Sequence, residues 1–380
     1  MTDIEKEIRE AKVRLCLDCG KCTSVCPVSQ YDPGFNPRLI IQRQLQPAEN
    51  KRKADDTIWS CLECRMCFER CDHRVKFPEF VRALRADSFS AGSQVQCSHG
   101  GTLQTLMRMM ARPGPRQARL DWLPRDIRLH AGGTLFFVGC APYLDVLFKD
   151  LGAKTLDSVE AALRLLNRAE VPFDLSPNEA CCGHDLLLQG DKEGFVALAR
   201  ANNEDFKKRG IKKIITNCPE CYYTLKIDYP EVLGRTGFEV VHLTEVLASL
   251  IKDKKLSLCK LEKRVTFHDP CTLGRGLRVF DAPRQVLESI PGLELVEMES
   301  NREQSLCCGA SAWVHCSAVS RQIQEQRLSQ AAASKADVLV TACPKCQIHL
   351  KCAQKCENIS IPPVEIQDLA FLAMQAIDRR

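Results

Sequence analysis

The chain has 380 residues, of which 45% are hydrophobic and 27% charged, a balance typical of a folded globular protein rather than a disordered or fibrous one. Its net charge of +5 is too small to indicate nucleic-acid binding, and no segment has the roughly 20 apolar residues of a membrane helix. Residues 1–11 carry charges of both signs and no apolar stretch, so we expect no secretory signal and a cytoplasmic location.

Cysteine is the residue type that stands out, with 23 in all. Disulfides need an oxidising compartment, and nothing in the sequence directs the chain to one. An odd number of thiols also fits poorly with complete pairing. We therefore favour metal ligation or redox chemistry over a disulfide framework.

The first cluster of cysteines, in residues 16–27, has the spacing C-x2-C-x2-C-x3-C-P, and residues 61–72 repeat it with Asp72 in place of the proline. This spacing ligates [4Fe–4S] clusters, and in two-cluster proteins the fourth cysteine binds the other cluster. Two zinc sites are the alternative, but zinc sites usually use paired C-x2-C units. We expect one cubane on Cys16, Cys19, Cys22 and Cys71, and the other on Cys26, Cys61, Cys64 and Cys67.

Short helical turns are predicted at residues 37–46 and 55–60, followed by a helix over residues 77–90. Residues 91–133 are rich in glycine and proline, with one predicted helix at residues 103–110. We interpret residues 96–133 as a linker that follows a two-cluster domain of residues 1–95.

Beyond the linker the chain repeats itself, at a distance of about 125 to 131 residues. Five cysteines recur in each copy: Cys140, Cys181, Cys182, Cys218 and Cys221 in the first, and Cys271, Cys307, Cys308, Cys343 and Cys346 in the second. Buried strands are predicted at residues 135–138 and 211–217, and again at 265–267 and 336–342. Residues 241–248 match residues 364–371 in the same way.

Alternating strands and helices predict a small α/β unit for each copy, over residues 134–256 and 257–380. The fold prediction is thus of a mixed α+β and α/β class: a helical ferredoxin-like domain followed by two α/β units. The carboxyl ends of parallel strands meet at one edge, so five thiolates converge in each copy. That is one more than a cubane needs, and an unusual cluster is predicted; a zinc site using four of the five, or a vicinal disulfide, is the alternative.

These motifs resemble the CCG-domain family of iron–sulfur proteins, whose best-known member is the catalytic part of heterodisulfide reductase. The resemblance rests on C-C-G-H-D at residues 181–185, C-C-G at 307–309, the two C-P-x-C motifs and D-P-C at 269–271. It covers almost the whole chain, in the fused arrangement of the D-type subunit. The resemblance implies two cubanes and two non-cubane [4Fe–4S] clusters, with a disulfide cleaved so that one sulfur goes to each non-cubane cluster. Thr272 and residues 310–313 depart from the family pattern and would alter the lining of the pocket.

Several residues beside the motifs are candidates for further roles. His184 and His268 could donate protons to a substrate sulfur, or only orient the ligands. Arg275 could bind a substrate anion or lie on the surface. Basic residues flank the cubane motifs and could attract an acidic partner or remain solvated: Lys21, Arg65 and Arg70. We expect ordinary core or surface positions for the five remaining cysteines: Cys97, Cys259, Cys316, Cys352 and Cys356.

We therefore predict an iron–sulfur reductase or electron-transfer subunit of a multisubunit anaerobic complex. Electrons would pass through the cubanes to the CCG clusters, which reduce a disulfide or relay them to a partner. The alternatives are a true catalytic subunit of CoB–CoM heterodisulfide reductase and the iron–sulfur subunit of a flavin-dependent glycolate or lactate dehydrogenase. No dinucleotide or phosphate-binding motif is found, so a flavin would lie on a partner, such as a heterodisulfide reductase A-like subunit. A membrane cytochrome is the other expected partner, and would tie the chain to the membrane.

Overall fold

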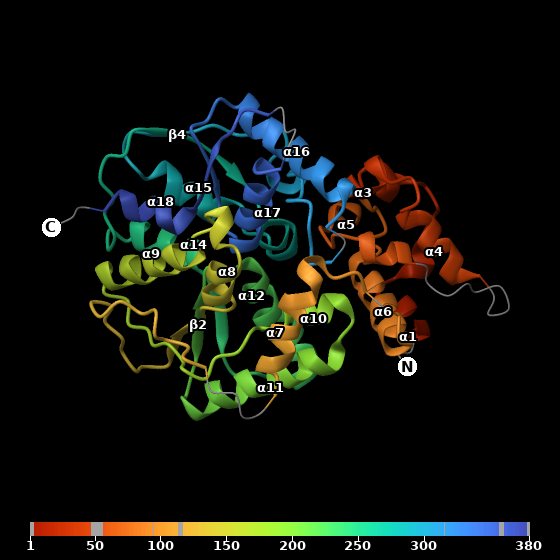
Figure 1. Ribbon diagram of the computed structural model, residues 1–380, viewed down its shortest axis with the longest axis horizontal. Coiled ribbons are helices and arrows are strands. Elements are labelled where there is room, and N and C mark those ends of the chain that lie inside the picture. The colour runs from red at the N-terminus through yellow and green to blue at the C-terminus, as the bar shows by residue number, and fades with distance from the viewer. Residues whose placement is uncertain are drawn as a thin grey trace.

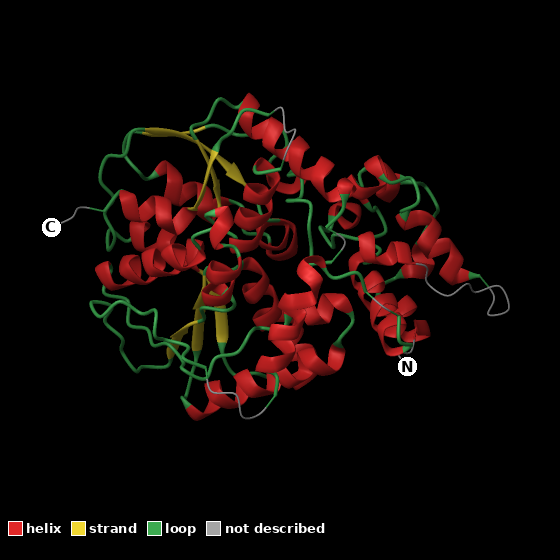
Figure 2. Cartoon of the chain, in the orientation of Figure 1, coloured by secondary structure: helices red, strands yellow, loops and turns green. Residues whose placement is uncertain are grey.

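The computed structural model describes residues 4–46, 56–93, 95–112, 117–314, 316–356 and 361–377. A helical N-terminal domain lies beside two α/β units, each with its own small sheet (Figure 1, Figure 2). No helix within these described residues is long and apolar enough to cross a membrane. The mixed helical and parallel-sheet fold predicted from the sequence is confirmed.

The N-terminal domain is built from short helices, because the two cysteine runs interrupt the chain so often. α2 (Lys21–Ser24) and α5 (Met66–Arg70) each follow the second cysteine of a run and pack against each other, which brings the two runs together. Proline opens α3 directly after Cys26, where its fixed φ suits the first helical turn. The other helices are α1 (Ile4–Glu10), α3 (Pro27–Tyr31), α4 (Pro37–Leu45) and α6 (Phe77–Ser90).

Each α/β unit contains a parallel sheet whose strand order repeats. The first sheet has the order β1-β2-β3 and the second β5-β4-β6-β7. In the first unit a single bridge between Leu135 and Asp174 stands where β5 pairs with β4 in the second. The strands are β1 (Thr134–Phe136), β2 (Lys213–Thr216), β3 (Glu239–His242), β4 (Lys263–His268), β5 (Leu293–Leu295), β6 (Val338–Thr341) and β7 (Glu365–Asp368).

The strands correct one detail of the predicted repeat. His242 and Asp368 each end the last strand of a unit and cap the following helix, α14 (Leu243–Lys252) or α18 (Leu369–Gln375). The structural partner of Val241 is therefore Gln367, and the predicted pairing of Val241 with Val364 is three residues out of register. Short apolar runs of the two copies can be aligned at several offsets from sequence alone. Strand pairing and helix capping allow only one alignment.

The two units pack as a pseudo-twofold pair. The first long helix of unit one, α9 (Thr155–Arg168), packs against α18, the last helix of unit two. Reciprocally, α15 (Asp281–Glu288) of unit two packs against α14 of unit one. These four helices lie between the two sheets in Figure 1. The reciprocal contacts are those expected of two equivalent units that bury matching faces.

The predicted linker contributes to packing. α7 (Thr102–Met110) contacts two helices of the first unit, α10 (His184–Gln189) and α11 (Lys192–Lys208). Leu103 and Met107 are buried in the core of that unit, while Met109 is exposed. The domain limits remain a prediction, but the described part of residues 96–133 packs onto unit one rather than bridging freely.

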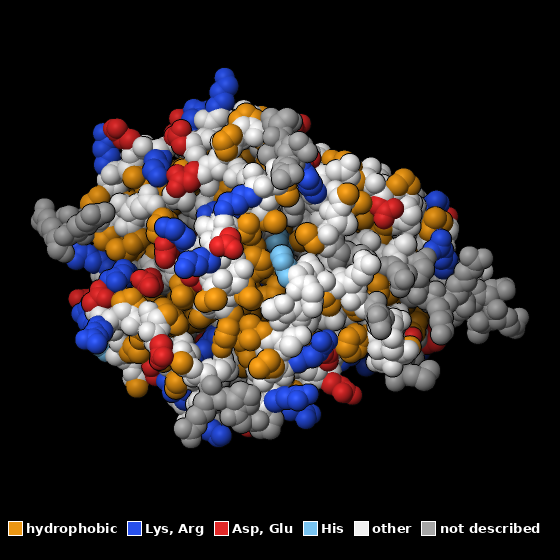
Figure 3. Space-filling model, viewed as in Figure 1, with side chains coloured by type: hydrophobic (Ala, Val, Ile, Leu, Met, Phe, Trp, Pro, Cys, Tyr) orange, Lys and Arg blue, Asp and Glu red, His pale blue; other side chains and the backbone are white. Residues whose placement is uncertain are grey.

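The N-terminal domain shares a hydrophobic core with the second unit. Ile40 and Phe80 of the first and Ile323 and Leu339 of the second belong to one cluster of buried side chains. A second cluster fills the first unit and the contact between the units. The remaining helices are α8 (Ala141–Leu147), α12 (Pro219–Tyr223), α13 (Tyr229–Leu233), α16 (Ala318–Ala333) and α17 (Pro344–Gln354). On the surface, charges of both signs are interspersed, in keeping with the small net charge (Figure 3).

Candidate iron–sulfur centres

The N-terminal cysteines fall into two groups. Cys16, Cys19, Cys22 and Cys71 line one pocket near the surface, together with Cys67. Cys26 does not belong to the described lining of that pocket. Burial raises the pKa of three thiols of the second run, and the nearby Cys26 adds to the rise: Cys61, Cys64 and Cys67. This grouping is compatible with crossed ligation, although the assignment of each ligand stays a prediction.

A buried arginine that the sequence did not single out holds the second run in place. Arg85 is fully buried and donates to the backbone oxygens of Ile58, Trp59 and Cys61 at 2.6 to 3.1 Å. It also donates to the Leu188 oxygen of the first α/β unit at 3.1 Å. One side chain thus shapes the cysteine loop and ties the N-terminal domain to unit one.

In the first CCG site, strand ends and helix starts bring five cysteines together. Cys140 follows β1, Cys218 follows β2, and Cys221 lies in the first turn of α12. Cys181 and Cys182 come from the loop before α10. The sulfurs of Cys140 and Cys181 are 3.0 Å apart, and those of Cys182 and Cys221 are 3.6 Å apart.

The second CCG site repeats this arrangement with different neighbours. Cys271 follows β4, and Cys343 follows β6 and caps α17, where its sulfur accepts a hydrogen bond from the Cys346 amide at 3.5 Å. The Cys308 sulfur lies 3.6 Å from His349 Nδ1. Interaction with the neighbouring Cys307 and Cys346 thiols holds the pKa of Cys308 well below its usual range.

The glycine of each CCG motif is required by the backbone. Gly183 and Gly309 have φ of 86° and 80°, a left-handed conformation that strains other residues. A Cβ on Gly309 would stand 2.6 Å from the Ser320 oxygen of α16. Glycine therefore allows the backbone of the second CCG motif to lie close to α16.

The donor sets fit iron–sulfur groups. Hydrogen bonding between neighbouring thiols, together with burial, raises the pKa of Cys182 and Cys221 in the first site and of Cys307 and Cys346 in the second. Thiolates, not thiols, bind metals, so positively charged iron would stabilise these crowded thiolates in a way that protons cannot.

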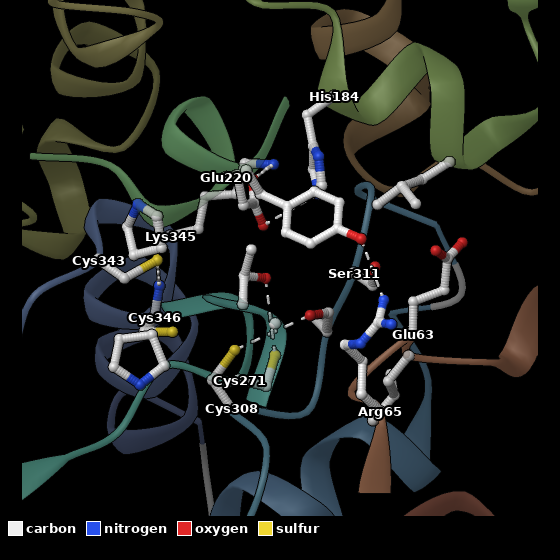
Figure 4. A pocket seen from close by; sticks show the side chains of 18 of the residues that line it. Glu63, Arg65, His184, Glu220, Cys271, Cys308, Ser311, Cys343, Lys345 and Cys346 are labelled. Carbon is white, nitrogen blue, oxygen red and sulfur yellow. Dashed lines mark hydrogen bonds and ion pairs between the residues drawn. The ribbon is translucent and has the colours of Figure 1, made fainter. Parts of the chain in front are cut away.

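A pocket of about 40 Å³ lies where the two units and the N-terminal domain meet (Figure 4). Four thiols of the second site line it: Cys271, Cys308, Cys343 and Cys346. None of the first site's five cysteines is among the described residues that line it. The thiols that line this pocket are thus those of the second site. As predicted from the departures in sequence, Thr272, Ala310 and Ser311 belong to its lining.

An ion-pair network crosses from one unit to the other beside this pocket. Lys345, in C-P-K-C of the second unit, binds Asp185 and Glu220 of the first. Glu220 and Lys345 occupy the same position of the two C-P-x-C motifs. Lys345 is 6% exposed, and its single positive charge is shared by two carboxylates, so the three groups together keep one negative charge. Long-range pairing of this kind leaves no local sequence pattern.

The two predicted histidines lie in different places. His184 lines the pocket and its Nδ1 is 2.9 Å from Thr224 Oγ1. Burial, aided by the charge of Lys345, lowers the pKa of His184 to about 3, so its imidazole is neutral. His268 lies outside the described lining of the pocket; its Nδ1 accepts from Arg327 Nε at 3.0 Å. Nε2 therefore carries its proton, and among the described residues it has no hydrogen-bond partner.

Other predicted candidates take simpler roles. Arg275 is neither a surface arginine nor free for a substrate anion, because it is 3% exposed and donates to backbone oxygens. Arg65 lines the pocket in an ion pair with Glu79 at 2.6 Å, whereas Lys21 pairs with Asp72 on the surface at 2.5 Å. The cysteines outside the motifs are exposed (Cys259, Cys316) or half-buried (Cys97, Cys352, Cys356).

Comparison with known proteins agrees with this architecture. A model for the cysteine-rich CCG domain matches residues 134–226 and 265–351, and a 4Fe–4S dicluster domain matches residues 12–75. The D-type subunit of the dihydromethanophenazine:CoB–CoM heterodisulfide reductase of Methanosarcina mazei is 33% identical, covering 95% of this chain and 93% of that protein. The EtfAB:quinone oxidoreductase of Syntrophomonas wolfei is 31% identical over 87% of this chain, which spans 54% of that longer protein.

Two further matches extend the comparison. The B-type subunit of the fumarate reductase (CoM/CoB) of Methanothermobacter marburgensis is 29% identical, covering 95% of this chain and 73% of that protein. A hypothetical protein from Helicobacter pylori, of known crystal structure, superposes with a TM-score of 0.55 at 11% identity, covering 100% of this chain and 72% of that one. At that identity the likeness concerns the fold alone.

These features define an iron–sulfur oxidoreductase subunit, in which a 4Fe–4S dicluster domain is joined to a duplicated cysteine-rich domain that serves electron transfer. More particularly, the chain belongs to the family formed by the D-type subunits of heterodisulfide reductase.

Proposed function

We propose that this chain takes single electrons from a partner redox protein at its N-terminal domain and uses them to reduce a disulfide in the pocket beside the second CCG site. One observation carries the proposal: four thiols of that site line a pocket that also holds a buried lysine ammonium. When bound, the iron–sulfur groups supply electrons one at a time.

The N-terminal domain supports electron entry from outside. Cys19 is exposed, and the pocket that it lines with Cys16 and Cys22 reaches the surface. Leu15 and Leu17 beside it are 50% and 70% exposed. An exposed apolar surface next to a redox centre suits docking of a partner, which we propose to be a flavin-containing subunit or a membrane cytochrome.

The pocket volume includes space that the second iron–sulfur group would take, because four of its thiols line the pocket. The volume of about 40 Å³ therefore sets no limit on the size of the substrate, and the substrate class is proposed from the relatives. The names of two relatives, a CoB–CoM heterodisulfide reductase and a fumarate reductase (CoM/CoB), contain the same pair of coenzymes. This supports a heterodisulfide as the substrate class.

Residues of the pocket assist the reaction electrostatically. Reduction breaks one S–S bond, takes two electrons from the partner protein and two protons from solvent, and yields two thiols. The Lys345 ammonium stabilises the thiolates as they form, before they are protonated. His184, neutral because of its lowered pKa, orients a sulfur by hydrogen bonding but carries no charge.

Dye-driven turnover under anaerobic conditions tests this proposal. Wild-type protein with its full iron content should oxidise reduced benzyl viologen when CoB–CoM heterodisulfide is added. Cys308→Ala should lose this activity while its N-terminal domain still accepts electrons from the dye. Cys259→Ala, at an exposed cysteine outside the motifs, is the matched control and should behave as wild type. The proposal would be refuted if reduced benzyl viologen were oxidised equally well without the disulfide, or if Cys308→Ala kept full activity.

A further inference from the structure

Two buried arginines near the second CCG site have no charged partner. Arg327 of α16 is 0% exposed. Besides His268, it donates to the Ser300 backbone oxygen at 2.7 Å, Gln330 Oε1 at 2.8 Å and Ser305 Oγ at 3.0 Å. All of these acceptors are neutral. Among the described residues no carboxylate forms an ion pair with Arg327.

The second arginine lies between this site and the N-terminal domain. Arg275 belongs to the π-helical turn Thr272–Gly276, directly after Cys271. Its Nε donates to the Cys64 oxygen at 2.6 Å, and its Nη1 to the oxygens of Ser305 and Glu303 at 2.6 and 3.1 Å. Its charge favours the thiolates of both Cys64 and Cys271. No carboxylate in the described part of the chain pairs with it.

The carboxylates close to Arg327 form their ion pairs with a different arginine. Asp269 and Glu297 both bind Arg284, at distances of 2.6 to 3.0 Å. Burial lowers the pKa of Arg327 to about 10, so the guanidinium still keeps its charge at neutral pH. A buried charge without a partner is costly. Three arginines (Arg275, Arg284 and Arg327) stand against two carboxylates (Asp269 and Glu297), which leaves one net positive charge beside this donor set. A thiolate-ligated iron–sulfur group would supply the negative charge that offsets it.

The first unit has neutral residues at the corresponding positions. The offset that relates Cys343 to Cys218 places Arg327 opposite Asn202, a buried amide that donates to the oxygens of Ala180 and Cys181. The offset that relates Cys271 to Cys140 places Arg275 opposite Leu144. The two sites thus have the same thiols and different buried charge.

Other cations near the first site are matched by carboxylates. Lys345 is shared between Asp185 and Glu220, and Arg119 pairs with Glu179 at 2.6 Å. At the first site these two cations stand against three carboxylates, so the named groups leave one net negative charge there. Among these described groups, a surplus of positive charge lies at the second site.

We propose that Arg275 and Arg327 are fixed counter-charges for the iron–sulfur group of the second CCG site, and make it easier to reduce than that of the first. Net charge and hydrogen bonding to the sulfurs set the reduction potential of such groups. Because Arg275 also contacts the backbone of Cys64, the second site adjoins the inner N-terminal centre as well as the pocket. Electrons arriving from that centre accordingly settle first at the site that lines the pocket. The proposal rests on the proposed function only in assuming iron–sulfur groups at both sites.

Redox titration of the full chain, purified anaerobically and followed by EPR, tests this. Arg327→Gln and Arg275→Gln remove the charge but keep hydrogen-bond donors, and Arg327→Lys keeps the charge. Both Gln variants should make the second site harder to reduce. The equilibrium constant for its reduction should fall at least tenfold, which corresponds to a midpoint potential lower by 59 mV for one electron. Arg327→Lys should stay near wild type. The signal lost in Cys308→Ala identifies the second site.

An exposed arginine close to the same turn provides the matched control. Arg278 is 53% exposed in its side chain and pairs with Glu69 and Glu303, so Arg278→Gln should leave every potential unchanged. Unchanged second-site potentials in both Gln variants at full iron content would overturn the proposal, as would an equal shift at the first site. If Arg327→Gln loses iron, the second-site potential of Arg275→Gln alone tests the proposal. No disulfide is present in this titration, so a failure of the proposed function would not affect its result.

Discussion

Replacing Lys345 by methionine removes the ammonium that forms ion pairs between the two CCG units. The side chain is 6% exposed and contacts Asp185 and Glu220 of the other unit. Methionine has nearly the same length, so the change leaves two adjacent buried carboxylates without a counter-ion and little empty space. Removing one partner of a buried ion pair costs about 3–5 kcal/mol of unfolding free energy. We expect Lys345→Met to lose an amount in this range.

The loss should grow with pH. Burial raises the pKa of Asp185, and Lys345 is the main group that lowers it. In Lys345→Met that pKa rises further above the unfolded value of about 3.9. The folded carboxyl then keeps a proton that the unfolded one releases, and stability falls as pH rises through this interval.

Urea unfolding at pH 5 and pH 8, with iron measured in the same samples, is the assay. The deficit should be larger at pH 8, and Glu220→Gln in the Lys345→Met background should recover part of it. An unchanged free energy of unfolding, or a deficit that does not depend on pH, would refute the reasoning.

Three further predictions concern metal content, ligation and pH. Four centres of four irons give about 16 iron atoms per chain. If iron and sulfide analysis instead finds about 8 iron atoms per chain, the CCG sites hold no iron–sulfur groups and this prediction is wrong. Cys26→Ala should damage the EPR signal of the centre assigned to residues 61–67; loss of the other N-terminal signal alone would make crossed ligation wrong. Burial raises the pKa of Asp368 to about 7, so stability should fall by up to about 4 kcal/mol as pH rises from 4 through 7. Asp368→Asn should abolish this slope in unfolding experiments, and a persistent slope would assign it to another group.

Much of the architecture could be predicted because its signals are local. The cysteine spacing, the proline after Cys26, Cys218 and Cys343, and the apolar runs before those cysteines all lie within a few residues of the structure they specify. A repeat of more than 100 residues then indicates two equivalent units. Local signals of this kind predict where each strand ends and which thiols meet.

The surroundings of the sites could not be predicted in this way. Lys345 and Asp185 are 160 residues apart, and Arg275 and Cys64 are 211 apart. Such pairs depend on how the units dock, which no local pattern encodes. The composition of residues 96–133 favours a linker because glycine and proline recur along it. Apolar positions such as Leu103 and Met107 are nevertheless buried against unit one.

Duplication alone would give two equal sites, and an electron shared between equal sites has no preferred direction. The structure breaks this equality with residues that do not touch iron. Arg327 of the second unit stands where the first unit has Asn202, and Arg275 stands where it has Leu144. Among the described residues, the second unit also shares a hydrophobic core with the N-terminal domain. Each difference favours the same site, the one whose thiols line the pocket. A duplicated scaffold can therefore give electron flow a direction while every cysteine ligand stays the same, because the potential of each centre depends on buried charges around it.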